Sequence, residues 1–148
     1  MALSPRQTSC GVLVTDGDRI LLGHASRSPR WDIPKGGAEP GENFADAAAR
    51  ELREETGLAV PASELVELGV HAYLRGKDLA LFAWAPPELP DPAGLSCSSY
   101  FTLPNGSRLP EFDRFGVFQW DDALSRVGKN LARVLTSISR NDLQHASK

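Results

Sequence analysis

The sequence has little of what marks the specialised protein classes. Among 148 residues there are two cysteines, one methionine and no long apolar run. Cys10 and Cys97 stand alone, which argues against a disulfide scaffold or a cysteine metal site, and we expect both to be reduced thiols. The longest apolar segments, such as residues 79–87, fall far short of the roughly 20 residues that a membrane-spanning helix needs. With 41% hydrophobic residues, the chain must instead fold around a core of its own.

A large excess of basic charge is also missing. Nineteen acidic and sixteen basic residues give a net charge of -3, and no run of lysine or arginine occurs. Binding to duplex nucleic acid or to an anionic membrane is therefore not expected, whereas a small phosphorylated ligand fits the composition. Residues 1–10 lack the apolar core of a signal peptide, so we expect a cytoplasmic protein. The length predicts one domain over residues 1–148.

Hydrophobic patterning predicts an α/β domain with a mixed sheet between helices. The β-rich runs at 8–15 and 19–24 predict a hairpin across 16–18, and those at 65–74 and 79–85 predict a second. Shorter strands are expected at 98–103 and 114–120, and a helix is expected at 43–56. A tail helix is predicted by apolar residues at helical spacing: Val127, Leu131, Val134, Leu135 and Ile138.

The segment 34–58 places acidic residues on a glycine-rich loop and then on the helix that follows. Glu51, Glu54 and Glu55 are spaced i, i+3 and i+4, so they share one arc of the helix. Like charges at this spacing cost about 0.2–0.5 kcal/mol per pair, and a divalent cation would offset the repulsion. Carboxylates suit Mg²⁺ or Mn²⁺, and Arg50 can orient a neighbouring carboxylate. The whole net charge of -3 resides in this segment, since the rest of the chain is neutral.

A Glu- and Arg-rich helix face is also typical of a solvated surface, so the helix alone decides nothing. The whole segment is more specific. Its order of Gly36, Glu42, Arg50-Glu51-Leu52, Glu54-Glu55 and Gly57-Leu58 matches every fixed position of the Nudix box, so the chain resembles the Nudix hydrolase family. Residues 31–36 (WDIPKG) are similar to a segment of dinucleoside-polyphosphate hydrolases and bacterial MutT-like proteins, and residues 110–114 (PEFDR) resemble a segment of the latter. Gly37 stands where the dinucleoside-polyphosphate pattern has histidine.

The resemblance implies an α/β/α sandwich and a metal-dependent hydrolase that cleaves a nucleoside diphosphate linked to another group, by attack of water on phosphorus. Carried over by position, the metal ligands are Gly36, Glu42, Glu51, Glu54 and Glu55. Arg50 is the orienting partner, and the general base is Glu51 or, from a distant loop, Glu111. The cofactor implied is Mg²⁺ or Mn²⁺.

Residues outside the box are candidates for contacting the substrate. Trp31 and Tyr73 can stack on a base, and Lys35 and Arg114 can bind phosphate, although core packing and solvated cations are the alternative interpretations. In the strand at 65–74 we expect Val70, Ala72 and Leu74 to face inward, leaving Tyr73 on the opposite face. A loop acid, Glu111 or Asp113, can complete a metal site or can serve a turn.

The sequence is compatible with three candidate functions. The first is pyrophosphohydrolysis of a nucleoside triphosphate, dinucleoside polyphosphate or related small molecule. The second is a Nudix-like module that binds a nucleotide or nucleotide sugar without cleaving it, although such modules commonly lose box residues that are all present here. An RNA 5′-end pyrophosphohydrolase would need a basic track, and the sequence shows none. Either a monomer or a homodimer is expected.

Overall fold

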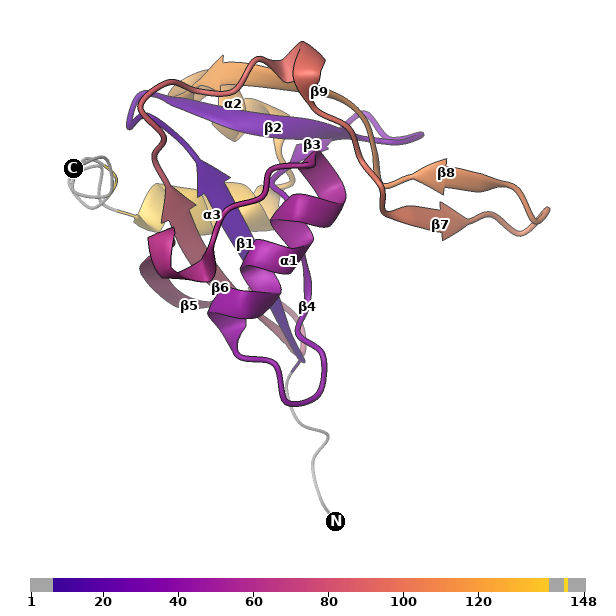
Figure 1. Ribbon diagram of the computed structural model, residues 1–148, viewed down its shortest axis with the longest axis horizontal. Coiled ribbons are helices and arrows are strands. Elements are labelled where there is room, and N and C mark those ends of the chain that lie inside the picture. The colour runs from indigo at the N-terminus through magenta and orange to yellow at the C-terminus, as the bar shows by residue number, and fades with distance from the viewer. Residues whose placement is uncertain (1–6, 139–142, 144–148) are drawn as a thin grey trace.

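The fold is organised around strand β1 (Gln7–Val14), which is buried from Ser9 onward. The computed structural model describes residues 7–138 and Leu143 (Figure 1). Strand β1 pairs antiparallel with β4 (Lys35–Gly37) and parallel with β6 (Lys77–Trp84), and β6 pairs antiparallel with β5 (Val66–Leu74). The first sheet therefore has the order β4-β1-β6-β5, and it contains both parallel and antiparallel pairs, as predicted.

A second sheet is formed around strand β2 (Arg19–Ala25), which lies between β3 (Trp31–Asp32) and β9 (Phe112–Gln119). The predicted hairpin between residues 8–15 and 19–24 is therefore wrong. In the described part of the chain, the two segments pair only at an isolated bridge between Thr15 and Ile20. Strand β1 pairs with β4 and β6, whereas β2 pairs with β3 and β9. The chain therefore leaves the first sheet at the turn 16–18 and enters the second.

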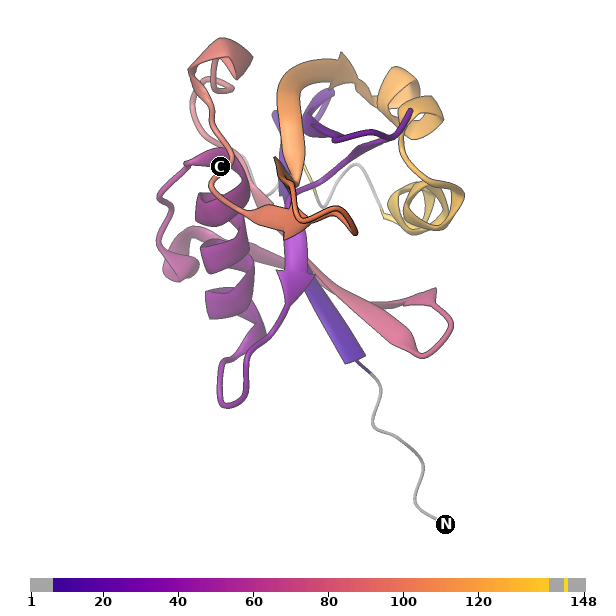
Figure 2. The ribbon, with the colours of Figure 1, turned by 90° about the vertical axis from the view of Figure 1, so that its right-hand side faces the viewer.

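Helices cover both sides of the sheets, as the predicted α/β/α sandwich requires. Helix α1 (Phe44–Thr56) lies on one side, and α2 (Trp120–Arg126) and α3 (Lys129–Ser137) lie on the other (Figures 1 and 2). Side chains alternate along β1 accordingly: Val12 packs with the α1 cluster, and Leu13 packs with the α2 and α3 cluster. The five apolar residues of the predicted tail helix are all buried. They do not lie on one continuous helix, because the helix is interrupted between α2 and α3.

The predicted hairpin at 65–85 is confirmed as β5 and β6, but the predicted orientation of β5 is reversed. Val70 is 56% exposed and Leu74 is 42% exposed, whereas Leu68 and Tyr73 pack against the core. Gly69 has a φ of 91°, and the pairing with β6 shifts register between Glu67 and Val70. This irregularity changes which residues of the edge strand face α3.

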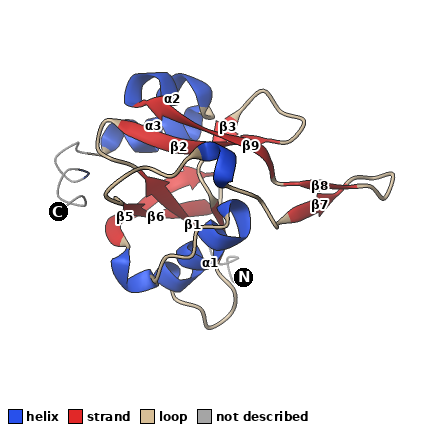
Figure 3. Ribbon diagram, turned by 45° about the horizontal axis from the view of Figure 1, so that its top comes forward, coloured by secondary structure: helices blue, strands red, loops and turns tan. Residues whose placement is uncertain are grey.

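The remaining elements are short. Two 3₁₀ turns, η1 (Ala62–Glu64) and η2 (Pro92–Gly94), flank the β5–β6 hairpin in sequence. Strands β7 (Tyr100–Thr102) and β8 (Arg108–Pro110) form a hairpin that projects from the body (Figures 1 and 3). No helix in the described residues is long and apolar enough to cross a membrane.

Candidate active site

Helix α1 carries the acidic residues, and local sequence fixes both of its ends. The Asn43 side chain accepts a hydrogen bond from the Asp46 amide at 2.8 Å, which caps the N-terminus. Gly57 ends the helix with a φ of 84°, a conformation that glycine adopts without steric cost, as expected from the sequence. The helix presents Leu52 to the sheet and carries Arg50, Glu51, Glu54 and Glu55 at the border of its buried face.

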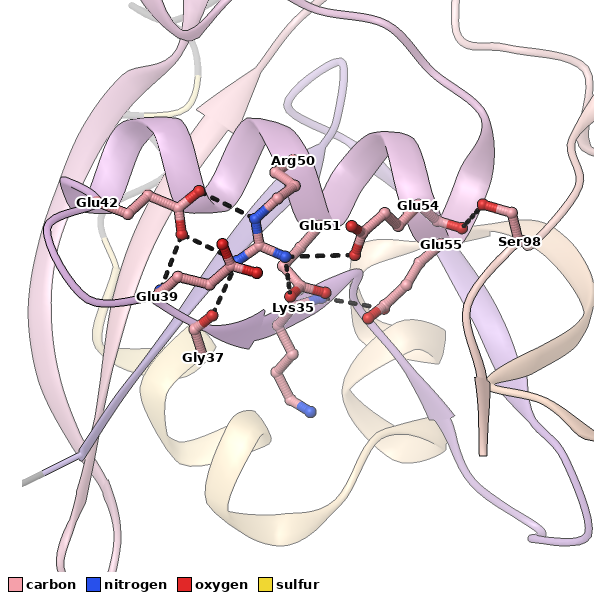
Figure 4. A network of polar contacts seen from close by, with 9 residues as sticks. All are labelled: Lys35, Gly37, Glu39, Glu42, Arg50, Glu51, Glu54, Glu55 and Ser98. Carbon is pink, nitrogen blue, oxygen red and sulfur yellow. Dashed lines mark hydrogen bonds and ion pairs between the residues drawn. The ribbon is translucent and has the colours of Figure 1, made fainter. Parts of the chain in front are cut away.

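Arg50 is the centre of a polar network that joins the loop to the helix (Figure 4). Its guanidinium donates two hydrogen bonds to the Glu42 carboxylate, each 2.9 Å long, and a third to the Gly37 carbonyl at 3.0 Å. It also contacts Glu51 at 2.9 Å and Glu54 at 3.3 Å. The bonds from Arg50 lower the pKa of Glu42 to about 2, so Glu42 remains charged and holds the glycine-rich loop against α1.

Two of the acids, Glu51 and Glu55, are buried next to each other. Their exposed fractions are 8% and 6%, which is unusual for carboxylates. Glu55 accepts a hydrogen bond from the Lys35 amide at 3.2 Å. Burial and the neighbouring Glu51 raise the pKa of Glu55 to about 9, so the metal-free site does not hold both carboxylates ionised at neutral pH. Gly36 lies directly against the Glu51 carboxylate, and a Cβ at that position would overlap it.

The donor set fits a divalent cation. Mg²⁺ and Mn²⁺ prefer hard oxygen ligands. The carboxylates of Glu51 and Glu55 supply such oxygens, and so does the backbone of Gly36, whose missing side chain lets the Glu51 carboxylate approach closely. A cation would also counter the burial and the nearby Glu51 charge that raise the pKa of Glu55. In the described residues, no three His, Cys, Asp or Glu side chains converge as a preformed ligand set, because Arg50 draws Glu51 and Glu54 toward its guanidinium.

The side chains of Lys35 and Tyr73, expected to contact substrate, lie together on the face of the sheet opposite α1, where Tyr73 packs with the α2 and α3 cluster. The Lys35 ammonium is 2.9 Å from the Asp32 carboxylate and 5.9 Å from the centre of the Tyr73 ring. Burial alone would lower the pKa of Lys35, but the negative charge of Asp32 raises it overall, so the ammonium stays charged. The Lys35 amide contacts Glu55, so this group continues directly from the box.

Trp31 and Arg114 form a second group, on β3 and β9. The Arg114 guanidinium lies 5.4 Å from the centre of the Trp31 ring, and His24 meets the edge of that ring at 5.2 Å. His24 is buried and its Nδ1 is 2.8 Å from Asp113. Glu111 is exposed, and in the described chain its contacts are through its backbone, to Ser99 and Ser26. The structure therefore brings Trp31 and Arg114 together but does not bring the Glu111 carboxylate into the box.

The sequence did not indicate the partners that hold several of these residues. Asp32 pairs with Lys35 and Asp113 pairs with His24, and neither pair follows from spacing alone. The Asp113 and His24 pair joins residues 89 positions apart, so only the pairing of β2 with β9 reveals it.

Comparison with known proteins identifies the family. The NUDIX domain family matches residues 5–94, more than half of the chain, and that range contains the whole acidic network. The chain belongs to the Nudix family. This is the family that the resemblance of residues 36–58 predicted.

Several relatives of this Nudix protein are similar in sequence. An uncharacterized 17.7 kDa protein from the e-segB intergenic region of Enterobacteria phage T4 is 39% identical over 144 residues, covering 88% of this chain and 93% of that protein. An RNA pyrophosphohydrolase from Dinoroseobacter shibae is 42% identical over 69 residues, 45% of this chain and 43% of the relative. An NAD-capped RNA hydrolase NudC from Pseudomonas putida is 34% identical over 117 residues, 68% of this chain and 40% of the relative. The match thus spans less than half of the two relatives with named activities.

Solved structures share the Nudix fold. The dihydroneopterin triphosphate pyrophosphohydrolase of E. coli superposes with a TM-score of 0.62 at 17% identity, covering 89% of this chain and 95% of that one. An Ap4A hydrolase of C. elegans superposes with a TM-score of 0.59 at 20% identity, covering 86% and 92% respectively. At these identities the likeness establishes the α/β/α fold.

Proposed function

We propose that this Nudix protein hydrolyses the diphosphate linkage of a nucleoside diphosphate joined to another group, with Mg²⁺ or Mn²⁺ as cofactor. The observation that carries the proposal is the pair of buried carboxylates within a complete Nudix box, Glu51 lying against Gly36 and Glu55 bonded to the Lys35 amide. Two carboxylates buried side by side are costly in a protein that has no cation to place between them. An anionic substrate and an acidic site are compatible once that cation is bound.

The residues of the box have different proposed roles, namely binding the ion and orienting its ligands. Glu51, Glu55, Glu54 and the Gly36 backbone would hold the ion, with Glu42 a weaker ligand because Arg50 engages both of its oxygens. When bound, the ion neutralises charge on the diphosphate and lowers the pKa of water. Arg50 orients the carboxylates of Glu51 and Glu54.

Of the two carboxylates expected as general base, Glu51 is better placed. It lies inside the network, in contact with Arg50 and beside Gly36, whereas Glu111 is exposed at the base of the β7–β8 hairpin. A general base must lie within hydrogen-bond reach of the proton it accepts. We therefore assign proton acceptance to Glu51.

The substrate contacts outside the box belong to the two groups around Lys35 and Trp31. The Lys35 amide contacts Glu55, whereas its ammonium is held by Asp32 and points away from that carboxylate (Figure 4); the ammonium is the proposed contact for a phosphate oxygen. Tyr73 and Trp31, which the sequence indicated as stacking residues, belong to these groups, and Arg114 is an exposed cation beside the Trp31 ring.

A substrate panel tests the proposal. The purified chain is incubated with Mg²⁺, and in parallel with Mn²⁺, on nucleoside triphosphates, dinucleoside polyphosphates, NADH, ADP-ribose, nucleotide sugars and a 5′-triphosphorylated RNA. We expect release of a phosphate- or pyrophosphate-containing product from at least one small molecule, and none in EDTA. Silence across the panel with both metals would support the non-catalytic binding module instead. Cleavage of the RNA alone would favour an RNA 5′-end activity, the class to which one relative belongs.

A further inference from the structure

A cleft of about 710 Å³ lies outside the box, between η2, the β7–β8 hairpin and the start of β9. Ligand pockets commonly have volumes of about 300–1,000 Å³. The family match ends at residue 94, and most of the cleft wall comes from residues beyond that point, including Leu95–Cys97, Tyr100 and Phe112–Phe115. Most of the cleft is therefore built by residues outside the region shared with the family. Residues that select one substrate within a family are expected in such a region.

The wall of this cleft is attached to the catalytic helix. The Ser98 amide and hydroxyl both donate to the Glu54 carbonyl, at 2.7 and 3.0 Å (Figure 4). The Ser96 amide donates to the Thr56 carbonyl at 3.1 Å. The segment 96–98 is thus bonded to the last turn of α1, the turn that carries Glu54 and Glu55. A ligand in the cleft would lie beside this end of the acidic network.

The lining suits a flat, uncharged group better than a phosphate. Phe112 and Phe115 lie edge to face at 5.8 Å, and Tyr100 is 49% exposed at the rim with the Arg108 guanidinium 5.1 Å from its ring centre. Two carboxylates, of Asp91 and Asp113, line the cleft against one guanidinium, Arg114. With Arg108 at the rim the charges balance, so the cleft has no excess of positive charge to attract phosphate, and its carboxylate oxygens favour a ring whose N–H groups donate hydrogen bonds.

Asp113 lines the cleft and has an oxygen that can accept from such a donor. His24 and Arg114 both contact its Oδ1, at 2.8 and 3.4 Å. Within the described residues no hydrogen bond to its Oδ2 is found. The pairing with buried His24 fixes the carboxylate in one orientation, so Asp113 can recognise a ligand without first becoming ordered.

We propose that this cleft binds the nucleobase of the substrate, with Tyr100 as a stacking surface and Asp113 as the acceptor for a base N–H. The inference rests on the proposed function in one respect, that the substrate is a nucleotide. It places the base on the β7–β8 side of the Nudix helix rather than beside Trp31 and Tyr73.

Nuclear magnetic resonance of the whole chain in EDTA tests the inference without turnover. The amide spectrum is titrated with the 5′-monophosphates of guanosine, adenosine, cytidine and uridine, and with ribose 5-phosphate, which has no base. We expect at least one nucleotide to change the amide chemical shifts of residues 95–100 and 112–115, and ribose 5-phosphate to leave those chemical shifts unchanged. Tyr100→Ala should weaken that binding about tenfold, since stacking on an aromatic side chain contributes strongly to base binding.

Phe44→Ala is the matched control, because Phe44 is a similarly exposed aromatic at the other end of α1, away from the cleft. Its nucleotide affinity should remain within about twofold of the wild type. Shifts confined to residues near Trp31 and Tyr73, no shift with any nucleotide at millimolar concentration, or unchanged affinity in Tyr100→Ala would each overturn the inference. Nucleotide binding in the cleft together with a silent hydrolysis panel would refute the proposed function alone.

Discussion

At the residue scale, one guanidinium organises the proposed metal site. Arg50 contacts Glu42, Glu51, Glu54 and the Gly37 carbonyl, which uses most of the five N–H groups that an arginine offers. A lysine could not make this set of contacts, because its ammonium lacks the planar fork. The sequence predicted that Arg50 would pair with a neighbouring carboxylate, and this is confirmed. The number of partners depends on how the loop folds back, which spacing alone does not show.

Glu54→Gln separates catalysis from folding. The Glu54 side chain is 37% exposed and contacts Arg50 at 3.3 Å, so its loss should change the unfolding free energy by no more than about 0.5 kcal/mol. We expect kcat to fall by orders of magnitude, because a ligand of the proposed ion is removed. Glu64→Gln, an exposed acid on η1, is the control and should keep wild-type kcat. Activity that survives Glu54→Gln would remove Glu54 from the metal site.

Two adjacent glycines give a sharper comparison. A Cβ at Gly36 would overlap the Glu51 carboxylate, whereas a Cβ at Gly37 meets nothing within 4 Å. Gly36→Ala should therefore displace Glu51 and lower both Mg²⁺ affinity and kcat, while Gly37→Ala should leave both near wild type. Isothermal titration with Mg²⁺ measures the first effect independently of turnover. Equal behaviour of the two variants would show that close approach at Gly36 is not required.

Glu55 should make the stability of the metal-free protein depend on pH. Its pKa is raised from an ordinary value of 4.5 to about 9, so between these values the folded chain binds a proton that the unfolded chain has lost. The unfolding free energy should then fall as pH rises through this window. Glu55→Gln, which mimics the protonated form, should flatten that part of the profile in thermal unfolding measured in EDTA. A wild-type profile no steeper than that of the variant would contradict the assignment.

At the scale of elements, helix α1 could be predicted almost completely and the strands only in part. The helix was expected at 43–56 with Gly57 beyond it, and both ends are confirmed because caps are set by neighbouring residues. Strand partners depend on distant residues. Strands β3, β4 and β8 are only two or three residues long, which is too short to show periodicity. Strand β9 begins two residues before its expected start, because Phe112 already pairs with Ala25.

The N-terminal cap of α1 should contribute measurable stability. Asn43→Ala removes the acceptor for the Asp46 amide and should lower the unfolding free energy by about 1 kcal/mol in urea denaturation. Asn43→Asp keeps a side-chain acceptor and should remain near the wild type. If alanine and aspartate behave alike, the cap makes no contribution in this helix.

At the scale of the whole molecule, the sequence predicted the layers but not the sheets. The order of the expected strands and helices, together with the resemblance to the Nudix family, correctly predicted helices on both sides of a mixed sheet. The hairpin expected at residues 8–24 failed because a glycine turn can either continue a sheet or start another. The register shift near Gly69 reversed the faces of β5, and no local signal gives its position.

The same division holds for the candidate site. Residues within the box could be named from spacing, and the structure places Arg50, Glu42, Glu51 and Glu54 in one network. The Lys35 side chain extends from β4 toward Tyr73 on β5, at the opposite edge of the same sheet, so this contact could be found only from the fold.

The most direct test of the central claim is the substrate panel with Mg²⁺ in water labelled with ¹⁸O, with products analysed by mass spectrometry. The account predicts that a substrate is cleaved at its diphosphate linkage and that one ¹⁸O atom enters a phosphate-containing product, with no reaction in EDTA or with Glu54→Gln. Undiminished cleavage in EDTA, label in a product that carries no phosphate, or no cleavage of any substrate would contradict it.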